Sequence, residues 1–199
     1  MKFSIRSSLV LIAGCVFFVG LGSSDAVAGK IPLQSLAGTF TLTGGGSFAV
    51  CTGPAPTFTE IACSSFVEGT DFFFPQTMAE VGIDTVDAQG NSCATGTETV
   101  SDFPVDFSPP EVTTFNSVSH LKDYDPSTGV GDATGTSYTG GSCNGAVFNS
   151  SGATEISTFM AHFVASDNGK RLDYLITALQ DPVGGIGDFS LTFTALARP

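Results

Sequence analysis

The feature that most constrains the fold is a strict two-residue alternation of apolar and polar side chains near the C-terminus. In the first alternating segment the apolar residues are Phe159, Ala161, Phe163 and Ala165. Asp167-Asn168-Gly169 follows, and Asn-Gly favours a type I′ hairpin turn. The alternation then continues over 172–178 and 189–195. A period of two sends neighbouring side chains to opposite faces of a sheet, so this region predicts three antiparallel strands, each with one buried face.

Weaker alternation of the same kind runs through the rest of the chain. Further strands are expected over 39–43, 79–84, 95–100, 115–124, 130–138 and 143–148. In 79–84 the rule puts Ala79, Val81 and Ile83 on the buried face. The 18 Phe and 24 Gly residues also suit strands and turns. Roughly eight strands with hairpin-length connections predict an all-β fold, an antiparallel up-and-down β-barrel, because closure removes exposed strand edges. A β-sandwich is the alternative.

Three segments interrupt the strand pattern. Residues 52–75 and 102–112 are expected to be loops, because both are rich in proline and neither alternates. The first ends in Phe72-Phe73-Phe74, which we expect to be buried in the core, since large exposed apolar patches are uncommon. Gly44-Gly45-Gly46-Ser47 lacks the lysine and the following helix of a phosphate-binding loop and is expected to be a flexible turn.

The N-terminus has the pattern of a secretory signal peptide. Lys2 and Arg6 precede an apolar run from Leu9 to Gly22, and Ala26-Val27-Ala28 is a small-x-small cleavage site. The prediction is a signal peptide over 1–28, a single β-barrel domain over 29–199 and a secreted or periplasmic location. A second interpretation is a lipid anchor at Cys15, but the apolar run continues past that residue. The run is too short to be expected to span a membrane.

Four further cysteines, Cys51, Cys63, Cys93 and Cys143, are predicted to form two disulfides in an exported domain. Three pairings are open. We favour Cys51–Cys63, which would close a local loop near 52–75, and Cys93–Cys143, which would tie distant strands. A zinc site is disfavoured because the chain has no C-x-x-C spacing and only two histidines.

The expected opening strand and several turns resemble those of a family of small exported bacterial β-barrel proteins with no assigned activity. The matching segments are Gly38–Leu42, Ala88-Gln89-Gly90-Asn91, Asp167–Lys170 and Asp181-Pro182-Val183-Gly184. The resemblance implies a barrel similar to calycins, which are lipocalin-like, or to allene oxide cyclases. Phe40 stands where the lipocalin signature has Trp. The matching motifs are turns, so the resemblance assigns no functional residue.

Chemistry-bearing motifs are scarce. The net charge of −12 disfavours binding to nucleic acid or to anionic membrane surfaces. The chain has no G-x-S-x-G nucleophile motif, and its two histidines, His120 and His162, lie in predicted strands. Asp123-x-Asp125-x-Ser127 begins like a calcium loop but lacks the later Gly and Glu. The sequence therefore predicts no catalytic residue, no metal site and no cofactor.

The sequence favours a secreted, non-enzymatic β-barrel that binds a small apolar ligand or a protein partner. A barrel filled by its own phenylalanines, such as Phe40, Phe159, Phe163, Phe189 and Phe193, would contradict ligand binding. One alternative is an isomerase- or cyclase-type barrel enzyme, which would need histidines or carboxyl groups with shifted pKa values meeting in a pocket. Another is a surface structural protein.

Overall fold

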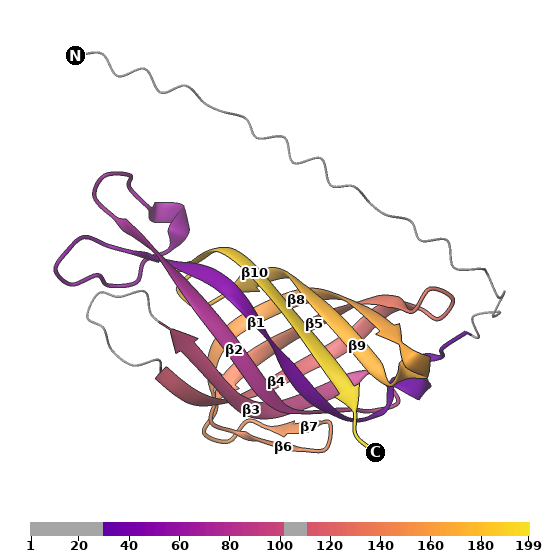
Figure 1. The fold of residues 1–199 in the computed structure, drawn as a ribbon. Coiled ribbons are helices and arrows are strands. Elements are labelled where there is room, and N and C mark those ends of the chain that lie inside the picture. The colour runs from indigo at the N-terminus through magenta and orange to yellow at the C-terminus, as the bar shows by residue number, and fades with distance from the viewer. Residues whose placement is uncertain (1–29, 102–110) are drawn as a thin grey trace, which may run out of the picture.

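A computed structural model describes residues 30–101 and 111–199 as a closed antiparallel β-barrel (Figure 1). The order around the barrel is β1-β10-β9-β8-β5-β4-β3-β2, so the barrel strands pair in chain order and β10 closes onto β1. The barrel strands are β1 (Gly38–Thr52), β2 (Phe72–Val86), β3 (Asn91–Ser101), β4 (Glu111–Asp125), β5 (Val130–Thr139), β8 (Thr154–Ser166), β9 (Arg171–Gln180) and β10 (Ile186–Ala197). The up-and-down barrel is confirmed, and the sandwich is wrong. The expected signal peptide and the Cys15 anchor lie outside the described residues.

Between β5 and β8 the chain makes a small hairpin of β6 (Ser142–Asn144) and β7 (Val147–Asn149). One strand was expected over 143–148, but the chain reverses at Gly145, whose φ of +60° suits glycine. The hairpin packs outside the barrel against β3. Cys143 is bonded to Cys93, and the Phe148 ring stacks on Tyr138 with centroids 4.8 Å apart.

Apolar side chains fill one end of the barrel. The short 3-10 helix η1 (Leu33–Leu36) crosses this end and buries Leu36 completely. Phe40 and Phe163 fill the lumen beneath it, and the Tyr124 ring stacks on Phe163 at 5.7 Å. A second 3-10 turn, η3 (Asp167–Gly169), joins β8 to β9 and packs against η1. This core closes the barrel at one end.

The opposite end carries a long connection between β1 and β2 (Figure 1). It contains the 3-10 turn η2 (Cys63–Ser65), and the Cys51–Cys63 disulfide holds it. Residues 72–75, expected in the loop, instead begin β2. Phe72 and Phe73 are 43% and 45% exposed, so their expected burial in the core is wrong. Phe72 packs edge-on against Phe58 of the loop instead.

The outer and inner faces of β2 are the reverse of the expectation. Val81 and Ile83 are exposed on the outside of the barrel, whereas Asp84 is buried. The register fixes this orientation, because Asp84 lies opposite Phe40, an inward residue of β1, and Glu80 lies opposite Gly44 on the same face. The sheet pairing of β2 thus places its acidic residues inside.

Three inward phenylalanines lie across from glycines on the neighbouring strand. The register pairs are Gly44 with Phe193, Gly131 with Phe163 and Gly135 with Phe159. Each ring covers its glycine so closely that an added Cβ would lie 2.3 to 2.7 Å from a ring carbon. Gly44 to Ser47 were expected to form a flexible turn but lie within β1. Because the glycines let the rings lie against the wall, Phe159 and Phe193 leave space in the lumen.

Within the described ranges, no helix is both long and apolar enough to cross a membrane.

Candidate ligand-binding site

The half of the barrel away from η1 encloses a cavity of about 530 Å³. This volume falls within the range of about 300–1,000 Å³ typical of small-molecule sites. Strands β1, β9 and β10 give it a wall that is apolar apart from Tyr174. The aliphatic and Phe members of that wall are Leu42, Phe48, Val50, Ile176, Leu179, Ile186, Leu191 and Phe193. The barrel is therefore filled at one end and hollow at the other.

Polar side chains are concentrated on the opposite wall, from β2 to β8, where Met78 and Phe115 lie among them. Five serines on four adjacent strands face the cavity: Ser92, Ser117, Ser119, Ser137 and Ser157. Ser117, Ser137 and Ser157 form one continuous row across β4, β5 and β8. The Ser92 and Ser119 hydroxyl oxygens are 2.8 Å apart. The cavity consequently has one apolar side and one side rich in hydrogen-bonding groups.

Glu80 and Glu98 are directly opposite each other on β2 and β3, and both line the cavity. The Thr113 hydroxyl donates a hydrogen bond of 2.8 Å to the Glu98 carboxylate. Burial, and then the charge of Glu98, raises the pKa of Glu80 to about 8. At neutral pH Glu80 is therefore protonated and can donate a hydrogen bond, whereas the neighbouring Glu98 carboxylate accepts one.

Asp84 lies deeper, where the cavity meets the filled end. Its side chain is buried, and within the described part of the chain no donor reaches its Oδ1 atom. Burial raises the pKa of Asp84 to about 6, although hydrogen bonds from the Ser92 side chain and the Thr85 backbone oppose the rise. Burial, and next the Asp84 charge, raises the pKa of the neighbouring Tyr174 well above its ordinary value. At pH 7 most Asp84 is a buried carboxylate with one oxygen unpaired.

At the mouth, Glu60 of the loop meets Asp181 of the β9–β10 connection. Desolvation, a hydrogen bond to Asp181 and the Asp181 charge together raise the pKa of Glu60 to about 7. Desolvation opposes ionisation of Asp181, but hydrogen bonds from Gly185, Glu60 and Gly184 lower its pKa overall. The Cys51 and Cys63 amides donate to the carbonyls of Gly185 and Gly184, each at 2.8 Å. These contacts hold the loop against the rim.

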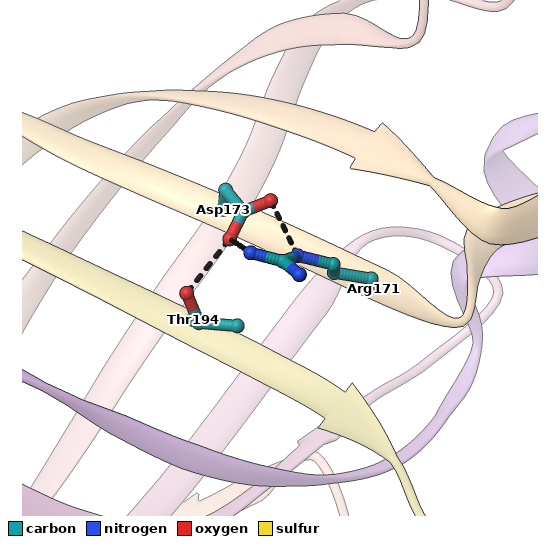
Figure 2. Close-up of polar contacts among 3 residues, drawn as sticks. All are labelled: Arg171, Asp173 and Thr194. Atoms are coloured by element: carbon teal, nitrogen blue, oxygen red, sulfur yellow. Dashed lines mark hydrogen bonds and ion pairs between the residues drawn. The ribbon is translucent and has the colours of Figure 1, made fainter.

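A carboxylate on the outer wall provides a contrast with those inside. Asp173 of β9 accepts hydrogen bonds from Arg171, at 2.7 and 2.9 Å, and from Thr194, at 2.7 Å (Figure 2). The bonds from Arg171 lower the pKa of Asp173. In the cavity, by comparison, no Lys, Arg or His occurs among the described lining residues. The inner carboxyl groups thus face serines, a tyrosine and apolar side chains instead of cations.

The histidines and the calcium-like segment, which the sequence analysis considered for catalysis or metal binding, lie outside the cavity. His162 points outward and pairs with Asp132, and the His120 ring lies 3.1 Å from the Asn91 amide oxygen. Asp125 accepts hydrogen bonds from the Ser127 amide and hydroxyl. The Asp123-x-Asp125-x-Ser127 spacing, which begins like a calcium loop, therefore belongs to the turn between β4 and β5. The sequence did not predict that Glu80, Asp84 and Glu98 face the cavity, because alternation places the apolar face of a strand inside, and in β2 the polar face is the inner one.

Comparison with protein-family models, curated proteins and solved structures finds no match for this chain. The structure shows a closed antiparallel barrel of eight strands, which is consistent with the calycin-like architecture that the sequence resemblance implies. Both favoured disulfides, Cys51–Cys63 and Cys93–Cys143, are present, which is compatible with an oxidising compartment.

Proposed function

We propose that this protein is a secreted or periplasmic binding protein that holds a small, largely apolar molecule inside its barrel. The observation that carries the proposal is the cavity of about 530 Å³, with its broad apolar wall from β1, β9 and β10. Burial of a ligand against such a wall is favourable by about 25 cal/mol per Å² of apolar surface. The resemblance of the sequence motifs to calycin-like barrels, together with the closed eight-stranded topology, agrees with this role. Export through the expected signal peptide is part of the proposal.

Dye binding tests the proposal directly. N-phenyl-1-naphthylamine is an uncharged dye that becomes fluorescent in apolar sites, and we expect saturable, one-to-one binding to the full domain. Ser137→Phe would place a ring in the cavity, and Thr136→Phe provides the control, because Thr136 lies on the same strand and faces outward. Loss of binding in Ser137→Phe alone supports an internal site. No saturable binding, or equal binding by both variants, overturns it.

A second candidate, an isomerase-type enzyme, is favoured by one observation. The facing pair Glu80 and Glu98 combines a proton donor and a proton acceptor inside the cavity, as acid–base catalysis requires. The test is α-proton exchange of 2-tetralone in D₂O, followed by NMR, with wild type and Glu80→Gln. Acceleration that disappears in the variant supports an enzyme. An unaccelerated rate contradicts acid–base catalysis on a cyclic ketone and leaves the binding role intact.

A further inference from the structure

We infer that the ligand carries a protonated amine, which Asp84 binds at the inner end of the cavity. This inference rests on the proposed binding function and names the chemical class that the site selects. Two independent features carry it: the charge pattern of the whole cavity, and one unpaired oxygen at its floor.

The charge pattern selects against anions. Asp84, Glu80 and Glu98 line the cavity, and among its described lining residues there is no Lys, Arg or His to balance them. An apolar acid would bring another negative charge into a low-dielectric space without a counter-ion, which is strongly unfavourable. An ammonium group brings the missing positive charge. The serines and the Tyr174 hydroxyl provide further hydrogen-bonding partners around it.

The unpaired Oδ1 atom of Asp84 indicates where the amine would bind. Oδ1 of Asp84 is buried and has no hydrogen-bond donor in the described part of the structure, and buried polar atoms are rarely left unsatisfied. Hydrogen bonding by Ser92 lowers the pKa of Asp84, and the Ser92 hydroxyl oxygen lies 2.8 Å from that of Ser119, so hydroxyl groups lie beside the carboxylate. A ligand ammonium would supply the missing donor as a charge-assisted hydrogen bond, the stronger class of such bonds.

Position along the barrel distinguishes Asp84 from the glutamate pair. Asp84 and Glu80 lie four residues apart on β2, or about 13 Å along an extended strand. One ammonium cannot contact both. Glu80 is protonated at pH 7, whereas Asp84, with a pKa of about 6, is mostly ionised. Leu42, Phe193 and Leu191 on the apolar wall would contact the body of the ligand, with its amine directed to the floor.

Three matched probes test the inference: 2-naphthylmethylamine, 2-naphthalenemethanol and 2-naphthoic acid, titrated calorimetrically into the intact protein at pH 7.5. They share one ring system and differ in the charge of the head group. We expect the amine to bind at least about tenfold more tightly than the alcohol, and the acid least. Equal affinity for amine and alcohol overturns the inference but leaves the binding function standing. Absence of binding by all three overturns both.

Two isosteric variants then locate the amine. Asp84→Asn should weaken amine binding about tenfold or more and alcohol binding by much less, because a hydroxyl can still hydrogen-bond the Asn amide. Glu80→Gln should weaken amine binding less than Asp84→Asn does. A larger loss in Glu80→Gln than in Asp84→Asn overturns the assignment to Asp84. Thermal unfolding of both variants checks that they fold.

A pH series on the wild-type protein gives an answer independent of the variants. The other titratable groups that line the cavity with Asp84 are Tyr174 from β9, Glu98 from β3, Glu80 on its own strand, Glu155 from β8, and Glu60 and Asp181 at the mouth. Amine affinity should fall about tenfold between pH 7.5 and pH 5, because Asp84 takes up a proton near pH 6. Alcohol affinity should change much less over the same range, because the alcohol carries no charge. A constant amine affinity overturns the inference.

Discussion

Glu80 on β2 and Glu98 on β3 are direct cross-strand neighbours, and both side chains face the lumen. Like charges in directly opposite positions destabilise a sheet, and burial increases the cost of each charge. The barrel accommodates the pair by keeping Glu80 protonated at neutral pH, with a pKa of about 8. The Glu80–Glu98 pair therefore lowers the stability of the fold, as is common at positions where binding or catalysis determines which residues are present.

The first prediction concerns stability against pH. The folded protein holds the Glu80 proton up to about pH 8, whereas the unfolded chain releases it near pH 4.5. Between these values the folded state binds more protons, so the free energy of unfolding falls as pH rises. Glu80→Gln removes this penalty and should stabilise the protein by about 2 kcal/mol at pH 8.5 and by much less at pH 5. Urea unfolding at both pH values measures the difference.

Glu68→Gln is the control for this prediction, because Glu68 is an exposed residue of the β1–β2 connection. It should change the free energy of unfolding by less than about 0.5 kcal/mol at either pH. If Glu80→Gln is no more stable than wild type at pH 8.5, ionisation of Glu80 does not destabilise the folded protein.

The second prediction concerns the mouth of the cavity. Below about pH 7 Glu60 is protonated and hydrogen-bonds Asp181; above it the two carboxylates repel each other and the loop contact weakens. Because Glu60 is exposed, we expect a loss of less than about 1 kcal/mol. Hydrogen exchange at the Ile61 and Cys63 amides, corrected for intrinsic rates, should show lower protection at pH 8 than at pH 6. These amides donate to Cys51 and Gly184.

Glu60→Gln separates this pair from other titrating groups. The Gln side chain is uncharged and can donate an N–H to Asp181 at any pH, so amide protection in the variant should not depend on pH. The same pH dependence in Glu60→Gln and wild type would assign the effect to another group.

Alternation predicted the strands well and the chemistry of the cavity poorly. The C-terminal strands carry Phe, Leu and Ala on one face, and Phe163 and Leu172 are buried as that contrast predicts. In β2 the apolar face of residues 79–84 lies outside the barrel, against the rule, because cross-strand register decides the direction: Asp84 is opposite the inward Phe40. Such pairing depends on contacts between distant segments, which single-strand periodicity cannot reveal.

Local irregularities of the strands could not be predicted from the sequence either. A register shift between Met160 and Ala161 lets Leu179 line the cavity, where Ala178 was expected to continue the inward face. The mid-strand glycine Gly44 was expected in a turn because glycine usually marks one. Here it makes room for the Phe193 ring instead. A glycine opposite an inward aromatic residue in a barrel is a usable signal once the register is known.

The third prediction ranks the two disulfides. Cys93–Cys143 closes 50 residues and Cys51–Cys63 closes 12. In the chain-entropy description the longer loop contributes about 4 kcal/mol and the shorter about 3. Replacing both cysteines of each pair with Ala should therefore lower the free energy of unfolding more for the Cys93–Cys143 pair. Urea unfolding of the two double variants measures this, and the reverse order would contradict the entropic explanation.

The last prediction tests whether glycine keeps the cavity open. A Cβ at residue 135 would lie 2.4 Å from both the Phe159 ring and the Val118 carbonyl oxygen. Gly135→Ala should therefore push the ring toward the lumen, cost about 1–3 kcal/mol of stability and weaken dye binding. Thr136→Ala, on the outer face of the same strand, should leave dye binding unchanged. Adding Phe159→Leu to Gly135→Ala should restore dye binding, because the displaced ring is gone, even though the contact with the Val118 carbonyl keeps the protein less stable. If Gly135→Ala binds the dye as tightly as wild type, the glycine does not set the size of the cavity.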